Sequence, residues 1–368
     1  MKRACYDIIA LNLVPGLGCR GIHALLNAAP DTGDIFGMSD IRLSGILGRK
    51  FEGADRIRSV RCSPEYAGEI EFIEKNGIKT VSWRDEDYPA DLRNIYDPPV
   101  LLCYKGTLLP GDTDAVAVVG SRRCSLYGLQ MSEKFSFELA VRGITVISGM
   151  ARGIDSAAHR GALKAGGRTI AVMGSGFAHV YPREAEKFLQ DIIENGAVIT
   201  EYPSWAEPAR ENFPRRNRII SGMSKGVLVV EAAKKSGAMI TVNLALEQGK
   251  EVFAVPGRID MSTSDGTNML IQSGAKLAWG VDDLLEELDL GPREARTGRK
   301  DIPGSPEKRA PDENHLRVLK ALGSGDPVHM DNIGECSGID AAALQETLLR
   351  MEIRGAIRAL PGRSYVRV

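Results

Sequence analysis

The sequence has 368 residues, of which 43% are hydrophobic, and its formal net charge at pH 7 is −1. This length predicts two or three domains with packed cores, and the near-zero charge excludes a uniformly basic surface, so a nucleic-acid interface must be a local patch. Six scattered cysteines without a Cys-x-x-Cys pair, no signal peptide and no apolar run of membrane-spanning length predict a cytoplasmic protein with reduced thiols and no membrane partner.

Residues 1–75 are predicted to form short helices joined by turns. The turn Pro15-Gly16-Leu17-Gly18 precedes a helical pattern of Ile22, Leu25 and Leu26. Because backbone N–H groups of such a turn can hold a phosphate, the segment is similar to a helix-hairpin-helix unit. A plain helix-turn-helix packing unit fits the pattern equally well. We expect a helical N-terminal domain of the SAM-like or helix-hairpin-helix-like kind.

Short apolar strands alternate with glycine turns and helices across residues 76–290. The alternation is typical of a parallel, doubly wound sheet, and the glycines fall at the carboxyl ends of the strands, where such sheets bind ligands. We therefore predict an α/β domain with an extended Rossmann-like fold. The expected strands are residues 79–81, 100–104, 115–119, 145–147, 169–173, 197–200, 227–230 and 252–255.

The C-terminal part is predicted to form a winged helix behind a linker. Residues 291–312 are polar, contain prolines and lack apolar periodicity, which is typical of a linker. Residues 313–368 show three helical patterns and a hairpin that turns at Pro361-Gly362. The third helix, residues 340–351, begins with apolar side chains that offer no hydrogen bond to a base edge. We expect this domain to contact protein and to add little to DNA affinity.

The segment Phe213-Pro214-Arg215-Arg216-Asn217-Arg218-Ile219-Ile220 places three arginines in four residues. Proline favours a first helical turn, so we predict a helix over residues 214–223. Ile219, Ile220 and Met223 share one face, and Arg216 lies on that face one turn earlier. Arg216 should therefore point beneath the helix, and Arg218 should point to the flank. An inward cation at a helix N-terminus favours an anion site over a solvated basic turn.

Several familiar ligand motifs are missing from the sequence. There is no G-x-x-x-x-G-K-[ST], and the loop after residues 115–119 is not G-x-G-x-x-G, which argues against P-loop and dinucleotide binding. The histidines show no metal-ligand spacing, and His159 is expected to be structural. Glu201, Glu231 and Asp265 could act as acids, but pairing with arginines or helix capping is the more common role. We predict no cofactor, no metal and no catalytic residue.

The loops at the strand ends combine glycines, arginines and aromatic rings. Glycine lets the backbone approach a ligand, and arginine binds phosphate through two parallel hydrogen bonds. Successive phosphate positions suit a polymer, and rings can stack on unpaired bases, although each ring alone also fits loop packing. The rings are Tyr127, Phe177, Tyr181, Trp205 and Phe213. The predicted residues for binding single-stranded DNA are Gly120, Ser121, Arg122, Arg123, Ser148, Gly149, Arg152, Gly153, Gly174, Gly176, Phe213, Arg215, Arg216, Asn217, Arg218 and Gly237.

Five segments together resemble the DNA-processing protein A (DprA/Smf) family. They are residues 119–122 with 127–128, 148–155, 213–222, 229–232 with 236–241, and 252–257. The resemblance implies a helical N-terminal domain, an extended Rossmann domain and a C-terminal winged helix. It also implies a homodimer that binds and protects incoming single-stranded DNA and loads a RecA-type recombinase in natural transformation.

In that family the DNA pocket uses the glycine-serine-arginine loop and the basic helix. The resemblance carries this role to Gly120, Ser121, Arg122, Arg216, Asn217 and Arg218. The chain departs from the family pattern at Ala178 and Ala185, where Asp and Asn are usual around Tyr181-Pro182. We therefore expect the third loop to differ in detail.

The alternative function is a nucleotide-processing enzyme. This type of Rossmann fold also occurs in nucleotide phosphoribohydrolases, which have a glycine-threonine turn at a helix start, and residues 236–241 fall at the comparable place. Such an enzyme needs an acid and an arginine that face the glycosidic bond. Glu231 and Arg216 are the candidates for these two roles.

Overall fold

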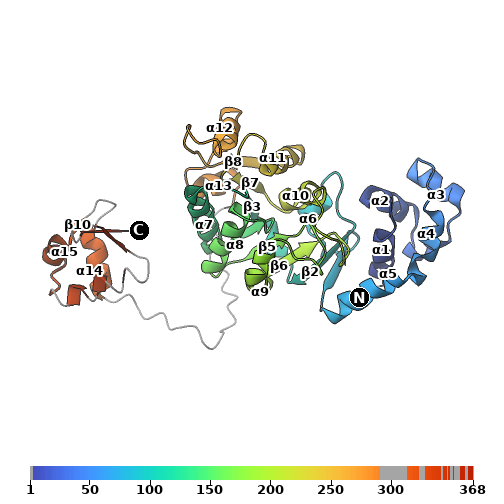
Figure 1. Cartoon of the computed structure of the whole chain (residues 1–368), viewed down its shortest axis with the longest axis horizontal. Coiled ribbons are helices and arrows are strands. Elements are labelled where there is room, and N and C mark those ends of the chain that lie inside the picture. Colours follow the sequence, from blue (N-terminus) through green and yellow to red (C-terminus); the bar gives the residue numbers. More distant parts are fainter. Residues whose placement is uncertain are drawn as a thin grey trace. The chain divides into compact units, whose positions relative to one another are not determined.

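The structure is a computed structural model that describes residues 3–290, 313–322, 328–340, 343–345, 347–348, 351, 357–360 and 364–367. The chain divides into two compact units, residues 1–296 and 297–368 (Figure 1). The predicted linker, residues 291–312, lies outside the described residues.

The first unit begins with short helices. They are α1 (Arg3–Asn12), α2 (Cys19–Ala28), α3 (Asp40–Leu47), α4 (Ala54–Ser59) and α5 (Pro64–Lys75). Serine side chains cap two of them, because Ser39 and Ser63 accept hydrogen bonds from backbone N–H groups in the first turns of α3 and α5. Leu25 and Leu26 of α2 share a buried core with Leu101, which belongs to the neighbouring sheet. The helices and the sheet are therefore packed together within this unit.

A mixed sheet forms the centre of the first unit. Its strand order is β1-β2-β6-β5-β4-β3-β7-β8-β9. The seven strands from β6 to β9 in this spatial order (β6, β5, β4, β3, β7, β8 and β9) are parallel to one another. Strands β1 and β2 form an antiparallel edge next to β6. The predicted Rossmann-like sheet is confirmed, and the antiparallel edge and β9 are additions that the sequence did not predict. The strands are β1 (Lys79–Ser82), β2 (Leu101–Gly106), β3 (Ala115–Val119), β4 (Thr145–Ser148), β5 (Thr169–Val172), β6 (Gly196–Thr200), β7 (Gly226–Val229), β8 (Glu251–Ala254) and β9 (Lys276–Leu277).

Helices cover both faces of this sheet, which explains why its strands are apolar on both sides. Val116 and Val118 of β3 pack in a core with α7 (Leu126–Val141), α8 (Ile154–Lys164) and α13 (Val281–Glu287). The alternate residues of the same strand pack in a second core with α10 (Asn212–Gly222) and α11 (Gly237–Glu247). The remaining helices of the unit are α6 (Ala90–Arg93), α9 (Glu186–Asn195) and α12 (Asp265–Gln272).

The topology creates a crevice beside β3. From β3 the chain adds β4, β5 and β6 on one side, and β7, β8 and β9 then extend the sheet on the other side. The strands β3 and β7 are neighbours, and the loops that follow them therefore lead to opposite sides of the sheet. In open α/β sheets such a switch point is where ligands bind, at the carboxyl ends of the strands.

The second unit contains helices and a small antiparallel sheet. Strand β12 lies between β10 and β11, and the pairing of β11 with β12 confirms the predicted hairpin strands. Val318, Ile333 and Ile357 share its core. The predicted turn and part of the predicted third helix lie outside the described residues. The elements are α14 (Glu313–Leu322), β10 (Val328–His329), α15 (Met330–Ser337), β11 (Ile357–Leu360) and β12 (Ser364–Arg367).

His159 of α8 is a buried structural residue, as the sequence predicted. Its Nδ1 lies 2.8 Å from Oγ1 of Thr169, and that hydroxyl donates a hydrogen bond to the carbonyl of Val146. The Thr169 oxygen must therefore accept from a protonated Nδ1, which fixes the neutral tautomer. Burial, with a smaller contribution from Arg216, lowers the pKa of His159 to about 3.

The lowered pKa of His159 predicts a pH-dependent stability. As the pH falls below the usual histidine pKa of about 6.5, His159 becomes protonated in the unfolded chain but stays neutral in the folded protein. The stabilisation is therefore complete at higher pH and is lost as the pH falls toward 3. We expect His159 to lower the free energy of unfolding by about 1.4 kcal/mol when the pH falls from 7.5 to 5.5.

Urea unfolding of wild type and His159→Asn at both pH values measures this effect. Asparagine keeps an N–H donor for Thr169 but does not titrate, so the variant should lose correspondingly less stability on acidification. Equal losses in the two proteins would contradict the prediction.

Candidate nucleic-acid interface

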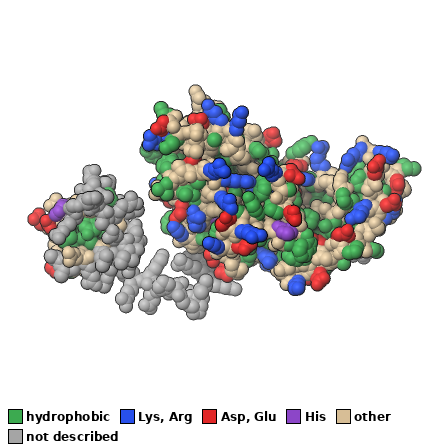
Figure 2. Space-filling model, viewed as in Figure 1, with side chains coloured by type: hydrophobic (Ala, Val, Ile, Leu, Met, Phe, Trp, Pro, Cys, Tyr) green, Lys and Arg blue, Asp and Glu red, His purple; other side chains and the backbone are tan. Residues whose placement is uncertain are grey.

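A cavity of about 810 Å³ lies at the switch point, beside the carboxyl ends of β3 and β7. Figure 2 shows Lys and Arg side chains close together in the part of the view where Figure 1 draws α10 and α11. The lining residues are Val119, Gly120, Ser121, Arg122, Arg123, Ala151, Asp155, Tyr181, Pro208, Arg210, Phe213, Pro214, Arg216, Asn217, Ile220, Ser236, Gly237, Ala238, Ile240 and Thr241.

Arg216 forms the floor of this cavity and is only 3% exposed. Its Nη1 donates to the carbonyl oxygens of Gly149, at 2.8 Å, and of Val172, and its Nε donates to Oδ1 of Asn217 at 3.2 Å. The side chain thus points inward and joins α10 to the ends of β4 and β5, as its helical phase predicted. Burial lowers the Arg216 pKa to about 10, and Asp155 opposes that shift, so the guanidinium stays charged at neutral pH.

Gly149 is required where Arg216 crosses the strand end. A Cβ at Gly149 would lie 2.6 Å from Nη2 of Arg216 and 2.7 Å from Oδ2 of Asp155. Asp155 is buried, accepts a hydrogen bond from the backbone N–H of Ala151 at 3.3 Å, and has a pKa raised by that burial, with Arg216 acting in the opposite direction. The absent side chain therefore lets an aspartate and an arginine share the cavity floor.

Arginines outnumber acids around the cavity. Arg122, Arg123 and Arg210 are exposed and line it together with Arg216, whereas Asp155 is the acid of the lining. Within the part of the chain that the structure describes, no ion pair involves Arg122, Arg123 or Arg210. Their guanidinium groups are available to phosphate oxygens, which they can hold with two parallel N–H donors.

The loops after β3 and β4 approach each other closely because both contain glycine. The Ser121 N–H donates to the Glu231 carbonyl at 2.7 Å, and the Ile154 N–H donates to the Ser121 carbonyl at 3.3 Å. A Cβ at Gly120 would lie 2.8 Å from the same Glu231 oxygen, and Gly153 has φ +79°. The two predicted glycines thus set the backbone path past the cavity.

Two aromatic rings stand at the cavity wall. The Phe213 ring centroid lies 4.8 Å from the Arg122 guanidinium carbon and 5.6 Å from the Tyr181 ring centroid. A Cβ at Gly174 would lie 2.8 Å from the Phe213 ring, so this predicted residue makes room for the ring. The arrangement places flat surfaces for stacking beside a cation that can reach phosphate.

The N-terminus of α11 opens toward the same cavity. Ser236 and Gly237 at its start line the cavity. The Ser236 hydroxyl oxygen is buried and has no hydrogen-bond partner among the described residues. The free N–H groups and partial positive charge of a helix start favour an anion there.

The structure does not bring every predicted residue to this cavity. Arg218 is buried on another side of α10, where it contacts Oε2 of Glu201 at 2.5 Å and Oδ2 of Asp97 at 3.1 Å. It therefore points away from Arg216, as predicted, but these carboxylates keep it out of the cavity lining, where it was predicted to bind DNA. Arg215 lies by Cys19 in a separate cavity of about 300 Å³.

Three further predicted residues have contacts of their own outside the cavity lining. Arg152 forms an exposed ion pair with Glu184 at 2.7 Å. The Ser148 hydroxyl donates to the Val118 carbonyl at 2.7 Å, and the Gly176 N–H donates to the Ala206 carbonyl at 2.8 Å. These residues join neighbouring strands and loops.

Arg210 and Pro208 were not predicted from the sequence, yet they line the cavity from the loop between β6 and α10. That loop has no periodicity from which a direction could be predicted. The feature that could have suggested Arg210 is its position, because it lies between a strand end and the basic helix.

Of the three acids considered as catalytic, two have structural contacts and the third lies at a helix start. Glu231 is 2% exposed and accepts hydrogen bonds from the backbone N–H of Ser125 at 2.9 Å and from its hydroxyl at 2.6 Å. Glu201 pairs with Arg218, and Asp265 lies in the first turn of α12. None of the three lines the cavity among the described residues, so the pair of Glu231 and Arg216 does not face a common ligand position there.

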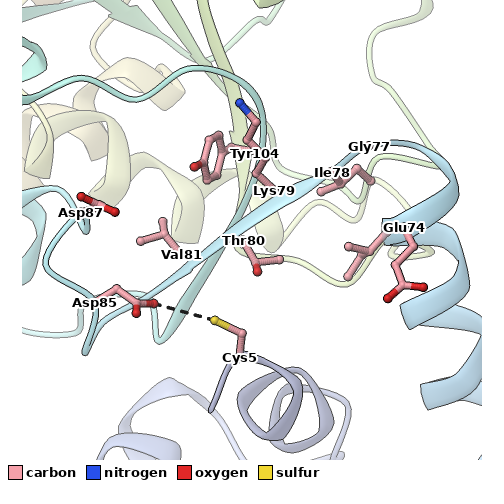
Figure 3. Close-up of a pocket in the computed structure, with 11 residues that line it drawn as sticks. Cys5, Glu74, Gly77, Ile78, Lys79, Thr80, Val81, Asp85, Asp87 and Tyr104 are labelled. Atoms are coloured by element: carbon pink, nitrogen blue, oxygen red, sulfur yellow. Dashed lines mark hydrogen bonds between the residues drawn. The ribbon is translucent and has the colours of Figure 1, made fainter. Parts of the chain in front are cut away.

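A second cavity, of about 440 Å³, lies between α1, α5 and β1 (Figure 3). Its charged lining residues are Glu74, Lys79, Asp85 and Asp87, and the Cys5 thiol donates to Oδ2 of Asp85 at 3.8 Å. Because acids exceed cations, this cavity is unsuited to phosphate, and the switch-point cavity is the better candidate.

Metal-ligand clusters and membrane-spanning helices are both absent from the described residues. Across these segments, no group of three or more His, Cys, Asp or Glu side chains could hold a metal ion. None of the helices there combines the length and hydrophobicity needed to cross a bilayer.

The fold and cavity define a Rossmann-type protein that can hold a phosphate-bearing ligand at its switch point. The chain belongs to the DNA recombination-mediator protein A family, whose profile matches residues 79–289. Residues 303–363 match the DprA winged helix domain. The family resemblance of the sequence is therefore confirmed, as is a C-terminal winged helix.

Relatives support this assignment over much of the chain. Protein Smf of Escherichia coli (strain K12) is 40% identical over 304 residues, which cover 81% of this chain and 79% of that protein. DNA processing protein DprA of Streptococcus pneumoniae is 48% identical over 207 residues, or 56% of this chain and 73% of that protein.

Solved structures agree with these relatives. The X-ray structure of DNA processing protein A from Streptococcus pneumoniae aligns with a TM-score of 0.66 at 37% identity, covering 78% of this chain and 99% of that one. A structure that describes the single-stranded DNA binding mode of DNA processing protein A from Helicobacter pylori aligns with a TM-score of 0.52 at 31% identity, covering 58% and 96%.

The hydrogen bonds of Arg216 predict that this residue stabilises the fold in addition to giving the cavity a positive charge. Arg216→Ala would leave the carbonyl groups of Gly149 and Val172 without their donor, so we expect a loss of about 2–3 kcal/mol in the free energy of unfolding. Arg122→Ala removes an exposed side chain and should change it by less than about 0.5 kcal/mol. Urea unfolding of both variants tests this contrast, and equal effects would contradict it.

Proposed function

We propose that the switch-point cavity binds single-stranded DNA, and that the protein protects incoming strands and loads a RecA-type recombinase on them in natural transformation. The observation that carries the proposal is one cavity that combines four arginines, a helix N-terminus and two aromatic rings. Membership of a DNA recombination-mediator family supports it. So does the relative from Helicobacter pylori whose structure describes single-stranded DNA binding.

The arrangement favours a single strand over a duplex. Phe213 and Tyr181 can stack only on bases that are not already paired and stacked inside a helix. The arginines beside the rings can neutralise the phosphates between successive bases, without reading base identity. The residues proposed to face DNA are Gly120, Ser121, Arg122, Arg123, Phe213, Arg216, Asn217 and Gly237 from the sequence prediction, together with Arg210 and Tyr181.

The recombinase partner and a homodimer belong to the proposal through the family resemblance. A dimer would carry two such cavities, and a strand long enough to reach both would be held more tightly than by either cavity alone. The proposal also places the protein in the cytoplasm, because a RecA-type recombinase would be its partner there.

A salt titration tests DNA binding. In wild type the logarithm of affinity for single-stranded DNA should fall linearly with the logarithm of salt concentration. Arg122→Ala should weaken binding regardless of base sequence and flatten the slope by about 0.7 for each phosphate that the variant no longer neutralises. Arg56→Ala is a matched control, because Arg56 is an exposed arginine of α4 that pairs with Glu65 at 3.4 Å. Unchanged affinity and slope in Arg122→Ala would refute the assignment.

We also propose that the protein is not an enzyme. The Glu231 carboxylate is occupied by the N–H and hydroxyl of Ser125 at the start of α7, so it is not free to act on a bound nucleotide. Asp155, the acid of the cavity lining, is buried beside Arg216. Wild type should therefore release no base from AMP in an adenine-release assay. Release of adenine that is abolished in Glu231→Ala, with the variant shown to be folded, would establish the hydrolase alternative instead.

A further inference from the structure

A second group of aromatic rings lies next to the N-terminal helices, on loops that also lead to the cavity. Tyr181 contacts Phe213 at the cavity wall. Two residues before Tyr181, the His179 ring lies 6.5 Å from the Trp205 ring, which in turn lies 4.9 Å from Phe72 of α5. Phe213 and Tyr181 are accounted for by the proposed DNA site. Trp205 is 57% exposed and has no role in that site.

The backbone holds Trp205 in a defined position despite this exposure. The Ala178 N–H donates to the Ser204 carbonyl at 2.9 Å, and the Gly176 N–H donates to the Ala206 carbonyl at 2.8 Å, so the residues on both sides of Trp205 are tied to the loop that leads to Tyr181. The Ser204 N–H donates in turn to the buried carboxylate of Glu69 at 2.9 Å. A large ring fixed at its base and open to solvent is suited to contact a ligand.

We propose that Trp205 is a stacking platform for a base of the single strand where it leaves the switch-point cavity. This inference rests on the proposed function, and it extends the site by one base-binding position. Pro208 and Arg210 of the same loop line the cavity three and five residues after Trp205. Five residues span at most about 18 Å, so a strand seated in the cavity reaches Trp205 within a few nucleotides.

The charges near Trp205 indicate a base contact without a phosphate contact. Glu65 and Glu69 line the surface beside it, and the exposed Glu207 follows it in sequence, whereas the arginines of the site lie further along the loop. A phosphate would be repelled there, while a neutral base can stack on the ring. Removal of the Trp205 ring should therefore weaken binding without changing its salt dependence.

An apolar cavity of about 550 Å³ adjoins the ring and includes Leu13, Pro64 and Pro203 in its lining. A protein side chain is the competing occupant of this surface. The position of Trp205 favours the DNA base, because the loop that carries it also contributes Pro208 and Arg210 to the cavity wall. The two occupants give opposite results in a DNA-binding measurement.

The experiment compares oligothymidylates of about 3 and about 20 nucleotides, which bracket the usual range of about 4–16 nucleotides for a single-strand site. The shorter strand fits within the cavity and does not extend to Trp205. The full-length variants Trp205→Ala, Trp205→Leu, Trp205→Tyr and Trp279→Ala are titrated by fluorescence anisotropy with labelled strands. Trp279 is a matched control, since it is an 84% exposed tryptophan after the edge strand β9, which five other strands separate from β6. Urea unfolding confirms that each variant is folded.

We expect Trp205→Ala to bind the longer strand about tenfold more weakly, with the shorter strand and the salt slope unaffected. Trp205→Tyr keeps a ring and should stay within about twofold of wild type, which attributes the loss in Trp205→Ala to the ring. Trp205→Leu keeps apolar bulk without a ring and should lose affinity for the longer strand as Trp205→Ala does, so it tests the inference even where the alanine variant does not fold. Trp279→Ala should bind both strands normally.

Normal binding of the longer strand by Trp205→Ala would overturn the inference and favour a protein partner for this surface. An equal reduction for both lengths would also overturn it, because the effect would then arise inside the cavity. Failure of wild type to bind either strand would instead refute the proposed function, which separates the two failures.

Discussion

The buried guanidinium of Arg216 sets the geometry of the whole site. A buried cation is costly unless its donors are satisfied, and here the carbonyl oxygens of Gly149 and Val172 accept them at the ends of β4 and β5. The same bonds fix the start of α10 against the sheet. Phe213 and Asn217, on either side of Arg216, are held at the cavity as a consequence. One side chain therefore supplies positive charge to the floor and also positions the groups around it.

Helical phase explains why the basic run is not a single binding patch. Successive residues of a helix are separated by about 100°, so Arg215, Arg216 and Arg218 must point in different directions. Arg216 reaches the sheet, Arg218 reaches two carboxylates in the protein interior, and Arg215 reaches Cys19 of α2. The exposed charge of the cavity comes mainly from loops, through Arg122, Arg123 and Arg210.

The arginines of α10 also show which features could be predicted from the sequence and which could not. Local periodicity correctly gave the strands and the inward direction of Arg216, because both follow from side-chain spacing within one element. That Glu201 would pair with an arginine was expected, but which arginine it meets, and the second partner Asp97, could not be predicted, since these residues come from other elements and meet Arg218 only in the folded protein. Arg210 was missed for the related reason that an irregular loop has no period.

Two smaller differences have equally local causes. Helix α10 begins at Asn212, so Pro214 is its third residue rather than its first, which remains compatible with a missing N–H in the opening turn. The antiparallel pairing of β1 with β2 was invisible in the sequence, because apolar strands of either orientation read alike when both faces are covered. Neither difference moves the switch point, which depends only on the order of β3, β4 and β7.

The composition of the cavity bears on what it could discriminate. Guanidinium groups, backbone N–H groups and aromatic faces bind phosphate and any base, whereas base identity is read by donors and acceptors aimed at base edges. Asp155 and Asn217 could make such contacts, but the first is buried beside Arg216 and the second already accepts a hydrogen bond from it. These two polar side chains thus lie against Arg216. A site in which phosphate and ring contacts predominate fits the proposed binding of single strands irrespective of their sequence.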